Sequence, residues 1–283
     1  MRPSRPVFVA TLLAFLLAGC QQAYFRAVNL GVAEGDAVAF DPAHGLSLDV
    51  YRAAAGATHP APVVVFFYGG SWRTGERAWY RFVGRALARE GFVVVIPDYR
   101  KAPAHPFPAF MHDAARATAW VRAHAGEIGG DPQRLFLMGH SAGAQIAALL
   151  ATDPRYLASE GLRPRQLAGV VGLAGPYDFL PLTSPSVKQA LGPADGWPAT
   201  QAINFVDGDE PPFLLMHGDA DRTVAPANTT RLAARLAAQG ESAQVVMVPG
   251  VSHVGLVNGF RAARFSPVLA DSVAWMRARA AAD

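Results

Sequence analysis

The chain has 283 residues, of which 51% are hydrophobic and 17% are charged. A chain of this length and composition buries a large core, which excludes a disordered tail and a solvated coiled coil. Its net charge of +3 comes without a basic block, so nucleic acid is not expected as a partner. A single α/β domain of roughly 250 residues is ordinary, and we expect one such domain here.

The N-terminus has the three parts of a secretory signal. A short segment with Arg2 and Arg5 precedes the apolar run of residues 7–18, and small residues follow it. The run is too short to cross a bilayer, which takes about 20 helical residues. Residues 1–19 are therefore predicted to be a cleaved signal peptide.

Cys20 is the only cysteine of the chain and stands directly after this leader. One cysteine excludes an intrachain disulfide, a cysteine zinc site and a cysteine–histidine catalytic pair. The segment Leu17-Ala18-Gly19-Cys20 resembles the lipobox of bacterial lipoproteins. This resemblance implies a lipid on Cys20 and a protein anchored in the cell envelope that faces the periplasm. Gln21 stands where an aspartate is associated with inner-membrane retention, which favours the outer membrane. The alternative is an ordinary secretory leader with an incidental cysteine.

Residues 20–58 look rich in loops and contain one alternating stretch, Leu46–Tyr51, which predicts a half-buried edge strand. From residue 59 to residue 283, short apolar runs alternate with segments of helical length, as is typical of βαβ units. The predicted strands are Val63–Tyr68, Phe92–Ile96, Leu135–Met138, Val170–Ala174, Phe213–Met216 and Val245–Val248, and the predicted helices are 82–90, 109–126, 142–151, 227–239 and 266–281. The sequence therefore predicts an α/β fold with a mostly parallel central sheet and helices on both faces.

One interval breaks this alternation. Residues 176–212 hold seven prolines and little periodicity, so they are predicted to form a small irregular cap instead of a crossover helix. A proline-rich, polar cap favours a small binding site over a long apolar trough. We therefore expect compact ligands.

The strongest chemical signal is Gly139-His140-Ser141-Ala142-Gly143, which lies between a predicted strand and a predicted helix. Glycines on both sides of a serine permit the cramped turn that lifts its hydroxyl above the sheet edge. The following helix directs its positive end at the place where negative charge develops on an acyl oxygen. Ser141 is therefore predicted to be a nucleophile.

A serine nucleophile needs a base and an acid that orients the base, in the chain order serine, acid, histidine. Asp221 and His253 follow two successive predicted strands and therefore lie at the same sheet edge as Ser141. Asp219 directly follows a turn glycine and is expected only to cap it. The predicted triad is Ser141, Asp221 and His253. No histidine pair has the spacing of a metal site, so no metal or other cofactor is expected.

A glycine-rich turn, Gly69-Gly70-Ser71, follows the first central strand. Glycines there allow backbone amides to approach a bound carbonyl oxygen closely. We expect the oxyanion hole to be formed by amides of Gly69, Gly70, Ser71 and Ala142. The candidate substrate-pocket residues are Tyr68, Trp72, His140 and Tyr177.

These motifs together resemble those of the α/β-hydrolase carboxylesterases, in particular the hormone-sensitive-lipase-like and feruloyl-esterase-like bacterial groups, and the chain is also similar to isoprenylcysteine methylesterase. The resemblance covers about residues 62–258 and includes connecting segments such as Asp98–Pro103 and Gly129–Pro132. The chain departs from the family pattern at Tyr68, where a histidine is usual, and at His140, where the lipase-like group often has aspartate. The resemblance implies an α/β-hydrolase fold.

The triad and the resemblance predict a serine carboxylesterase that hydrolyses small carboxylic esters through an acyl-enzyme on Ser141. An aryl-formamidase or a peptidase would use the same triad, because fold and triad do not determine the leaving group. A non-catalytic lipoprotein of this fold that binds a partner is the alternative outside the enzymes. The expected partners are a small ester and, through Cys20, a membrane, while the sequence indicates no oligomeric state.

Overall fold

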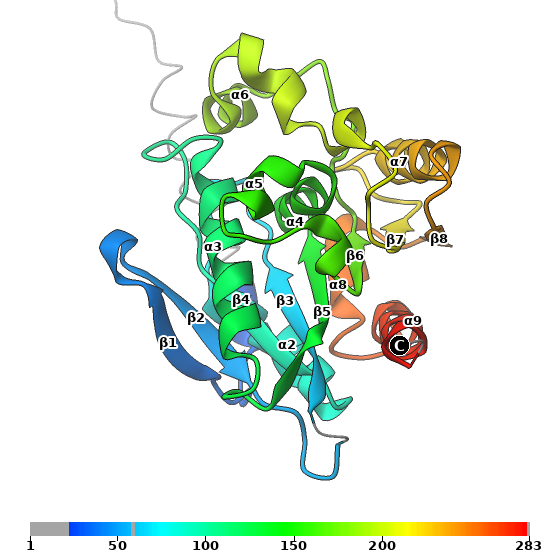
Figure 1. Ribbon diagram of the computed structural model, residues 1–283. Coiled ribbons are helices and arrows are strands. Elements are labelled where there is room, and N and C mark those ends of the chain that lie inside the picture. The colour runs from blue at the N-terminus through cyan, green and yellow to red at the C-terminus, as the bar shows by residue number, and fades with distance from the viewer. Residues whose placement is uncertain (1–22, 58–59, 282–283) are drawn as a thin grey trace, which may run out of the picture.

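Eight strands form one sheet through the centre of the protein, whose computed structural model describes residues 23–57 and 60–281 (Figure 1). The strands lie in the order β1-β2-β4-β3-β5-β6-β7-β8. β1 and β2 pair antiparallel, as do β2 and β4, and all other neighbours are parallel. The strands are β1 Asp36–Asp41, β2 Leu46–Tyr51, β3 Ala61–Phe67, β4 Val93–Pro97, β5 Gly130–His140, β6 Gly169–Leu173, β7 Phe213–Gly218 and β8 Ala243–Val248. The predicted mostly parallel sheet is confirmed.

The central strands are buried on both faces because their side chains are apolar on both faces. Residues Val63–Phe67 of β3 are all fully buried, and every residue of β4, β6 and β7 is buried. Valine, isoleucine and phenylalanine dominate these strands and pack well on a pleated surface. The sheet is therefore a rigid support for the loops at its carboxyl edge.

Helices cover both faces of this sheet. In Figure 1, α3, α4 and α5 lie in front of the sheet, and α2 lies behind it in contact with α9. α7 packs against β7 and β8, and α8 against β7. The helices are α2 Arg81–Arg89, α3 Ala109–His124, α4 Ala142–Thr152, α5 Pro154–Ala158, α6 Pro185–Leu191, α7 Ala227–Ala238, α8 His253–Asn258 and α9 Val268–Ala280.

The N-terminal segment is more ordered than the sequence indicates. Residues 23–28 are helical, and β1 pairs with β2, so β1 and not Leu46–Tyr51 is the edge strand. The prediction of a half-buried edge strand at Leu46–Tyr51 is wrong, because β1 and β4 flank this strand and bury most of it. Alanines at alternate positions of β1 weakened its strand signal, since alanine has low strand propensity. Residues 1–22, with the leader and Cys20, lie outside the described residues.

The insertion of residues 176–212 lies above the carboxyl ends of the parallel strands (Figure 1). It contains the short helix α6 and two 3₁₀ segments, η4 (Ala194–Thr200) and η5 (Ala202–Phe205), joined by irregular chain. Its first turn is held by α7, because the Asn228 side-chain oxygen accepts hydrogen bonds from the amides of Tyr177 at 2.9 Å and Asp178 at 2.8 Å. The cap is thereby fixed over the sheet edge that carries the predicted triad.

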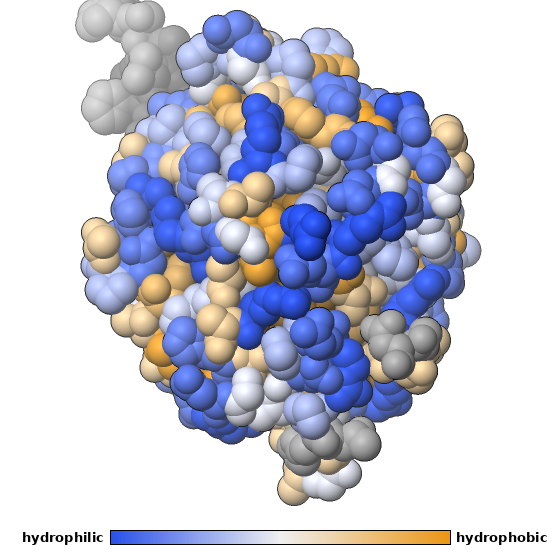
Figure 2. Space-filling model, viewed as in Figure 1, coloured by the Kyte–Doolittle hydropathy of each residue, from blue (hydrophilic) through white to orange (hydrophobic). Residues whose placement is uncertain are grey.

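The face of the molecule that bears α3, α4 and α5 is mainly hydrophilic, with apolar residues scattered among polar ones (Figure 2). Isolated apolar residues of this kind are normal on a protein surface. Within the part of the chain that the structure describes, no helix combines the length and the apolar character needed to cross a membrane.

Candidate active site

Ser141 lies on the turn between β5 and α4, in a backbone conformation that side-chain-bearing residues rarely adopt. Its φ of 56° and ψ of −123° place it outside the helical and extended regions. The turn closes so tightly that a Cβ on Gly143 would lie 2.0 Å from the Phe67 carbonyl oxygen. A Cβ on Gly139 would lie 2.2 Å from the Gly143 carbonyl oxygen. The two glycines are therefore required for the turn that carries Ser141.

His253 and Asp221 form a hydrogen-bonded pair. Nδ1 of His253 donates to Oδ2 of Asp221 over 2.6 Å, and the other carboxylate oxygen accepts from the amides of Thr223 at 2.8 Å and Val224 at 3.0 Å. Burial raises the pKa of Asp221, but these hydrogen bonds and one from His217 outweigh burial and hold that pKa well below its usual range. Asp221 is therefore an anion that orients His253 and leaves its Nε2 available.

Asp219, the other acid of this loop, serves a different purpose. Its Oδ1 accepts a hydrogen bond from the Gly250 amide over 2.6 Å, which ties the loop after β7 to the loop after β8. The structure thus brings Asp221, and not Asp219, to His253, as the sequence predicts.

His217 is a second imidazole on Asp221, and it is not among the residues predicted from the sequence. This fully buried side chain stands near the end of β7, with Nε2 3.1 Å from Oδ2 of Asp221 and 3.1 Å from the Val224 carbonyl oxygen. A carbonyl oxygen only accepts, so Nε2 carries the proton, and Nδ1 accepts from the Thr229 hydroxyl over 2.8 Å. The spacing of four residues between His217 and Asp221 was the one signal in the sequence.

His140 connects the serine turn to the histidine loop. Its Nε2 lies 3.2 Å from the backbone oxygen of His253, its Nδ1 lies 3.3 Å from the Tyr80 hydroxyl, and the two imidazole rings are 4.8 Å apart. Burial, followed by the neighbouring His253, lowers the pKa of His140 to about 3. His140 is therefore a neutral donor that holds the His253 backbone in place.

The turn after β3 presents free backbone donors. Gly70, Ser71 and Trp72 have φ of 139°, 53° and 58°, so three successive residues have left-handed or unusual backbone. Among residues 23–57 and 60–281, the amides of Gly70, Ser71 and Ala142 donate to no backbone carbonyl. Adjacent amides that lack partners are what an oxyanion hole requires. Burial raises the pKa of the nearby Tyr80 hydroxyl, and the Gly69 amide lowers that pKa in part.

Trp72 links this turn to α4 and to the cap. Its Nε1 donates to the side-chain oxygen of Gln145 over 2.9 Å, and the Gln145 amide nitrogen donates to the Thr200 carbonyl over 2.9 Å. Gln145 is fully buried, so both of its polar ends are committed inside the protein. The sequence indicated Trp72 but gave no sign of Gln145, which lies on a helix that otherwise reads as apolar.

Two cavities meet at Ser141. One, of about 440 Å³, extends under the cap and is lined by Ala142 and by cap residues that include Phe179, Leu182 and Val187. The other, of about 470 Å³, is lined by His253 and His140 and by Tyr24 and Phe25 of the N-terminal segment. The sequence did not indicate that the site has two cavities, because the N-terminal residues that line the second cavity lie more than a hundred positions before Ser141. We call them the cap cavity and the N-terminal cavity.

Two of the four predicted pocket residues lie elsewhere. Trp72 lines the cap cavity and His140 the N-terminal cavity, whereas Tyr68 and Tyr177 are fully buried and line neither. The Tyr68 hydroxyl donates to Asp98 over 2.9 Å, and its ring stacks on Tyr99. The prediction of Tyr68 and Tyr177 as pocket walls is therefore wrong, because both side chains turn into the core.

The described residues hold no group of three or more histidine, cysteine, aspartate or glutamate side chains placed to bind a metal ion. The chemistry of the site thus rests on a hydroxyl, an imidazole, a carboxylate and backbone amides. A serine on the turn after β5, followed in the chain by an acid after β7 and a histidine after β8, defines the class of the α/β hydrolases. More particularly, the chain belongs to the BD-FAE family, whose profile matches residues 48–236.

Relatives of known sequence and structure are esterases by name. The chain is 34% identical over 244 residues to esterase LipC of Mycobacterium tuberculosis, covering 78% of this chain and 59% of that protein. It is 29% identical over 222 residues to isoprenylcysteine alpha-carbonyl methylesterase of Arabidopsis thaliana, covering 69% and 51%. An esterase of Thermogutta terrifontis with butyrate bound superposes with a TM-score of 0.65 at 25% identity, over 77% of this chain and 84% of that one. The family resemblance predicted from the motifs is confirmed, although this chain spans only about half the length of the curated relatives.

Proposed function

We propose that this protein is a serine carboxylesterase that hydrolyses small carboxylic esters through an acyl-enzyme on Ser141. The observation that carries the proposal is the pair His253–Asp221, 2.6 Å apart, at the carboxyl ends of β8 and β7, with His253 lining a cavity together with a serine held on a strained turn. Esterases among the relatives support the reaction class.

In the proposed reaction, Ser141 attacks the ester carbonyl carbon while Nε2 of His253 accepts the hydroxyl proton. Asp221 stabilises the imidazolium that forms, and it keeps the proton of neutral His253 on Nδ1. The amides of Gly70, Ser71 and Ala142 bind the oxyanion. His253 then protonates the leaving alcohol, and a water molecule repeats the sequence on the acyl-enzyme.

The position of His253 assigns the two cavities to the two halves of the ester. The leaving oxygen must lie within reach of His253, and His253 lines the N-terminal cavity but not the cap cavity. The alcohol therefore occupies the N-terminal cavity and the acyl group the cap cavity. Butyrate in the Thermogutta esterase supports an acyl site of modest length.

Replacement of Ser141 by alanine tests the assignment of the nucleophile. Because triad members act as a unit, Ser141→Ala should lower kcat on p-nitrophenyl acetate by at least about 10⁴-fold. A fluorophosphonate probe should label the unchanged protein at Ser141 and leave the variant unlabelled. Retention of a tenth of the activity by a folded variant would refute the assignment. A parallel panel of aryl amides, formamides and peptides tests whether the triad catalyses one of these reactions in place of ester hydrolysis.

For the cell, we propose a lipoprotein anchored through Cys20 and facing the periplasm, with the outer membrane as its site. The lipobox-like segment before Cys20 supports this proposal. A diacylglyceryl cysteine with a further acyl chain would anchor the protein stably, since each buried methylene contributes about 0.8 kcal/mol. Mass spectrometry of the mature N-terminus should find a lipid-modified Cys20, and Cys20→Ala should prevent processing. An unmodified N-terminus at another residue would contradict the anchor.

A further inference from the structure

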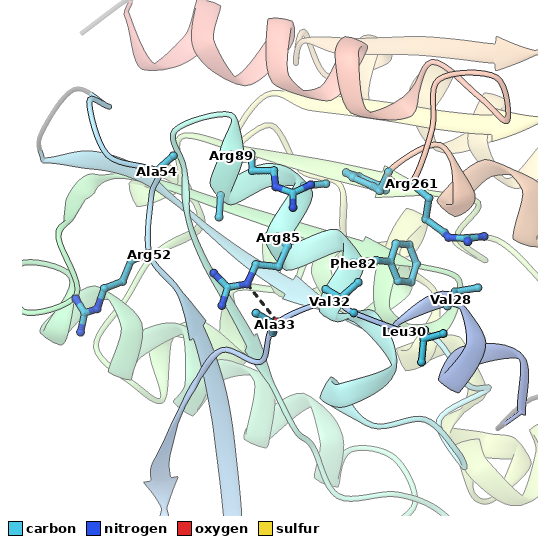
Figure 3. A pocket seen from close by; sticks show the side chains of 14 residues that line it. Val28, Leu30, Val32, Ala33, Arg52, Ala54, Phe82, Arg85, Arg89 and Arg261 are labelled. Atoms are coloured by element: carbon cyan, nitrogen blue, oxygen red, sulfur yellow. Dashed lines mark hydrogen bonds between the residues drawn. The ribbon is translucent and has the colours of Figure 1, made fainter.

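A cavity of about 460 Å³ lies behind the N-terminal segment, outside the site described above (Figure 3). Arg52, Arg85, Arg89 and Arg261 line it, together with apolar residues such as Val28 and Phe82. In Figure 3 the side chain of Arg89 extends from α2 toward the side where Arg261 lies. The cavity therefore combines an apolar floor with a strongly basic rim.

Acidic side chains compensate these arginines only in part. Arg52 pairs with Asp36 over 3.3 Å, whereas within residues 23–57 and 60–281 the exposed Arg89 and Arg261 form no ion pair. The acids of this region are already paired elsewhere, since Arg81 binds Glu34 over 2.6 Å and Arg277 binds Glu90 over 3.0 Å. The rim is consequently able to attract an anion.

An exposed apolar side chain lies beside the basic rim. Leu30, which lines the same cavity as the arginines, is 87% exposed, and Val254, which lines the N-terminal cavity, is 42% exposed. Large aliphatic side chains beside unpaired arginines are the combination found on surfaces that lie in a lipid interface. We call the surface made by residues 23–33, Arg85, Arg89 and 254–264 the N-terminal face.

The position of Cys20 in the chain limits where a lipid anchor can act, and this step rests on the proposed lipidation. Ala23 stands three positions after Cys20, so an extended chain places them at most about 10 Å apart. A bilayer that holds the lipid on Cys20 therefore lies next to the helix of residues 23–28. The anchor would therefore place the bilayer against the same surface on which the arginines and Leu30 lie.

The N-terminal face also borders the active site. Phe25 and Val257 line the N-terminal cavity beside Ser141. Three residues further along each segment, Val28 and Phe260 line the cavity with the arginine rim. Phe25 and Val28 lie nearly one helical turn apart, and Phe260 follows the end of α8, so the same two segments border both cavities. A membrane against this face would lie close to the cavity that receives the alcohol.

We propose that the N-terminal face docks on a bilayer rich in anionic lipid, with Arg89 and Arg261 contacting headgroup phosphates and Leu30 entering the interface. Docking turns the N-terminal cavity toward the membrane surface. The enzyme thereby acts on esters whose alcohol portion lies in that surface.

A single fluorescent probe tests this orientation, because the chain has no cysteine besides Cys20. The full chain is purified in detergent, labelled at Leu30→Cys with a fluorophore, and reconstituted into phosphatidylcholine vesicles with or without phosphatidylglycerol. The vesicles carry a headgroup-bound quencher. The matched control is Ala123→Cys, an exposed site on α3, which lies on the other face of the sheet. The probe at position 30, and not at position 123, should be quenched on the anionic vesicles.

Charge reversal tests the role of the arginines. Arg89→Glu and Arg261→Glu should each lower the docked population by about fivefold, and added salt should do the same. Turnover of soluble p-nitrophenyl acetate should stay unchanged. Equal quenching at positions 30 and 123, or quenching that survives both reversals, overturns the proposal.

Failures of the earlier proposals are recognisable separately. If the fluorophore labels the wild-type chain, Cys20 has a free thiol, which contradicts the proposed lipidation. If the protein does not hydrolyse esters, the proposed esterase function is contradicted. If Cys20 is free, the same probe pair is measured in a Cys20→Ser chain. There, selective quenching at position 30 supports docking, and equal quenching refutes it.

Discussion

At the scale of single residues, the buried ring of His217 contacts Asp221 through one nitrogen and Thr229 through the other. Asp221 was predictable because the order serine, acid, histidine and the ends of successive strands restrict the acid to one loop. His217 stands near the end of β7, and its spacing of four residues from Asp221 was a weak signal, because its role depends on the direction of its ring. Only the contacts at 3.1 Å and 2.8 Å show that it supports the acid.

We expect His217 to act as a positioning residue for Asp221. His217→Leu removes a hydrogen bond to a carboxylate, a kind of contact that contributes about 1.5–3 kcal/mol, so kcat should fall by roughly tenfold to a hundredfold. KM should change little, since His217 lines neither cavity. His217→Gln, which keeps an N–H donor, should recover part of the rate. Equal kcat in wild type and the leucine variant would show that Asp221 needs no such support.

His140 should make stability depend on pH. Its pKa is lowered to about 3 in the folded protein and is about 6.5 in an unfolded chain, so between these values the unfolded state binds the extra proton. His140 therefore costs the folded protein nothing well above pH 6.5. As the pH falls below this value, His140 lowers the free energy of unfolding by about 1.4 kcal/mol per pH unit. Urea denaturation of wild type and His140→Gln between pH 6.5 and 4.5 measures the difference in slope. Parallel slopes would mean that His140 is protonated in the folded state.

At the scale of elements, the parallel strands were predictable because each is a short apolar run buried on both faces. The N-terminal helix of residues 23–28 and β1 were not, because neither carries a periodicity strong enough to distinguish it from loop. Tyr68 and Tyr177 were misplaced for a related reason. An aromatic residue next to a strand end is compatible with a pocket wall or with the core, and only the packing decides.

The turn that carries Ser141 should have no room for a methyl group at Gly143. In Gly143→Ala the Cβ would meet the Phe67 carbonyl oxygen at 2.0 Å, and backbone at this position has little room to move. The free energy of unfolding should fall by about 3 kcal/mol, measured by thermal or urea denaturation. Gly126→Ala is the control, because a Cβ there has no atom within 4 Å. Equal losses in the two variants would contradict the packing of the turn.

At the scale of the whole molecule, the sheet, the cap and the N-terminal segment together form a site that no one of them contains. The sequence placed the cap over the active edge through its proline-rich composition, and the structure shows cap residues lining a cavity with Ser141. It did not place residues 23–28 there. Contacts between residues so far apart in the chain arise from the folded topology, which local patterns do not encode.

The cap should limit the acyl chain. In an apolar trough each added methylene would raise kcat/KM by up to about fourfold, since it contributes about 0.8 kcal/mol. We expect kcat/KM on p-nitrophenyl esters to rise only over the shortest acyl groups and to decline before about eight carbons, because cap residues line the cavity and limit its length. Phe179→Ala should shift this limit, whereas Tyr24→Ala, in the other cavity, should alter the preference for the alcohol. A steady rise beyond eight carbons would refute the limit.

The chain of contacts from Trp72 through Gln145 to Thr200 has a consequence for how such an enzyme evolves. The side chain of Gln145 binds the donor turn with one end and the cap with the other. A substitution that moves the cap to admit a larger acid would therefore also displace the amides proposed to bind the oxyanion. We expect variants that accept a larger acyl group to lose catalytic rate unless a second substitution restores the contacts of Gln145.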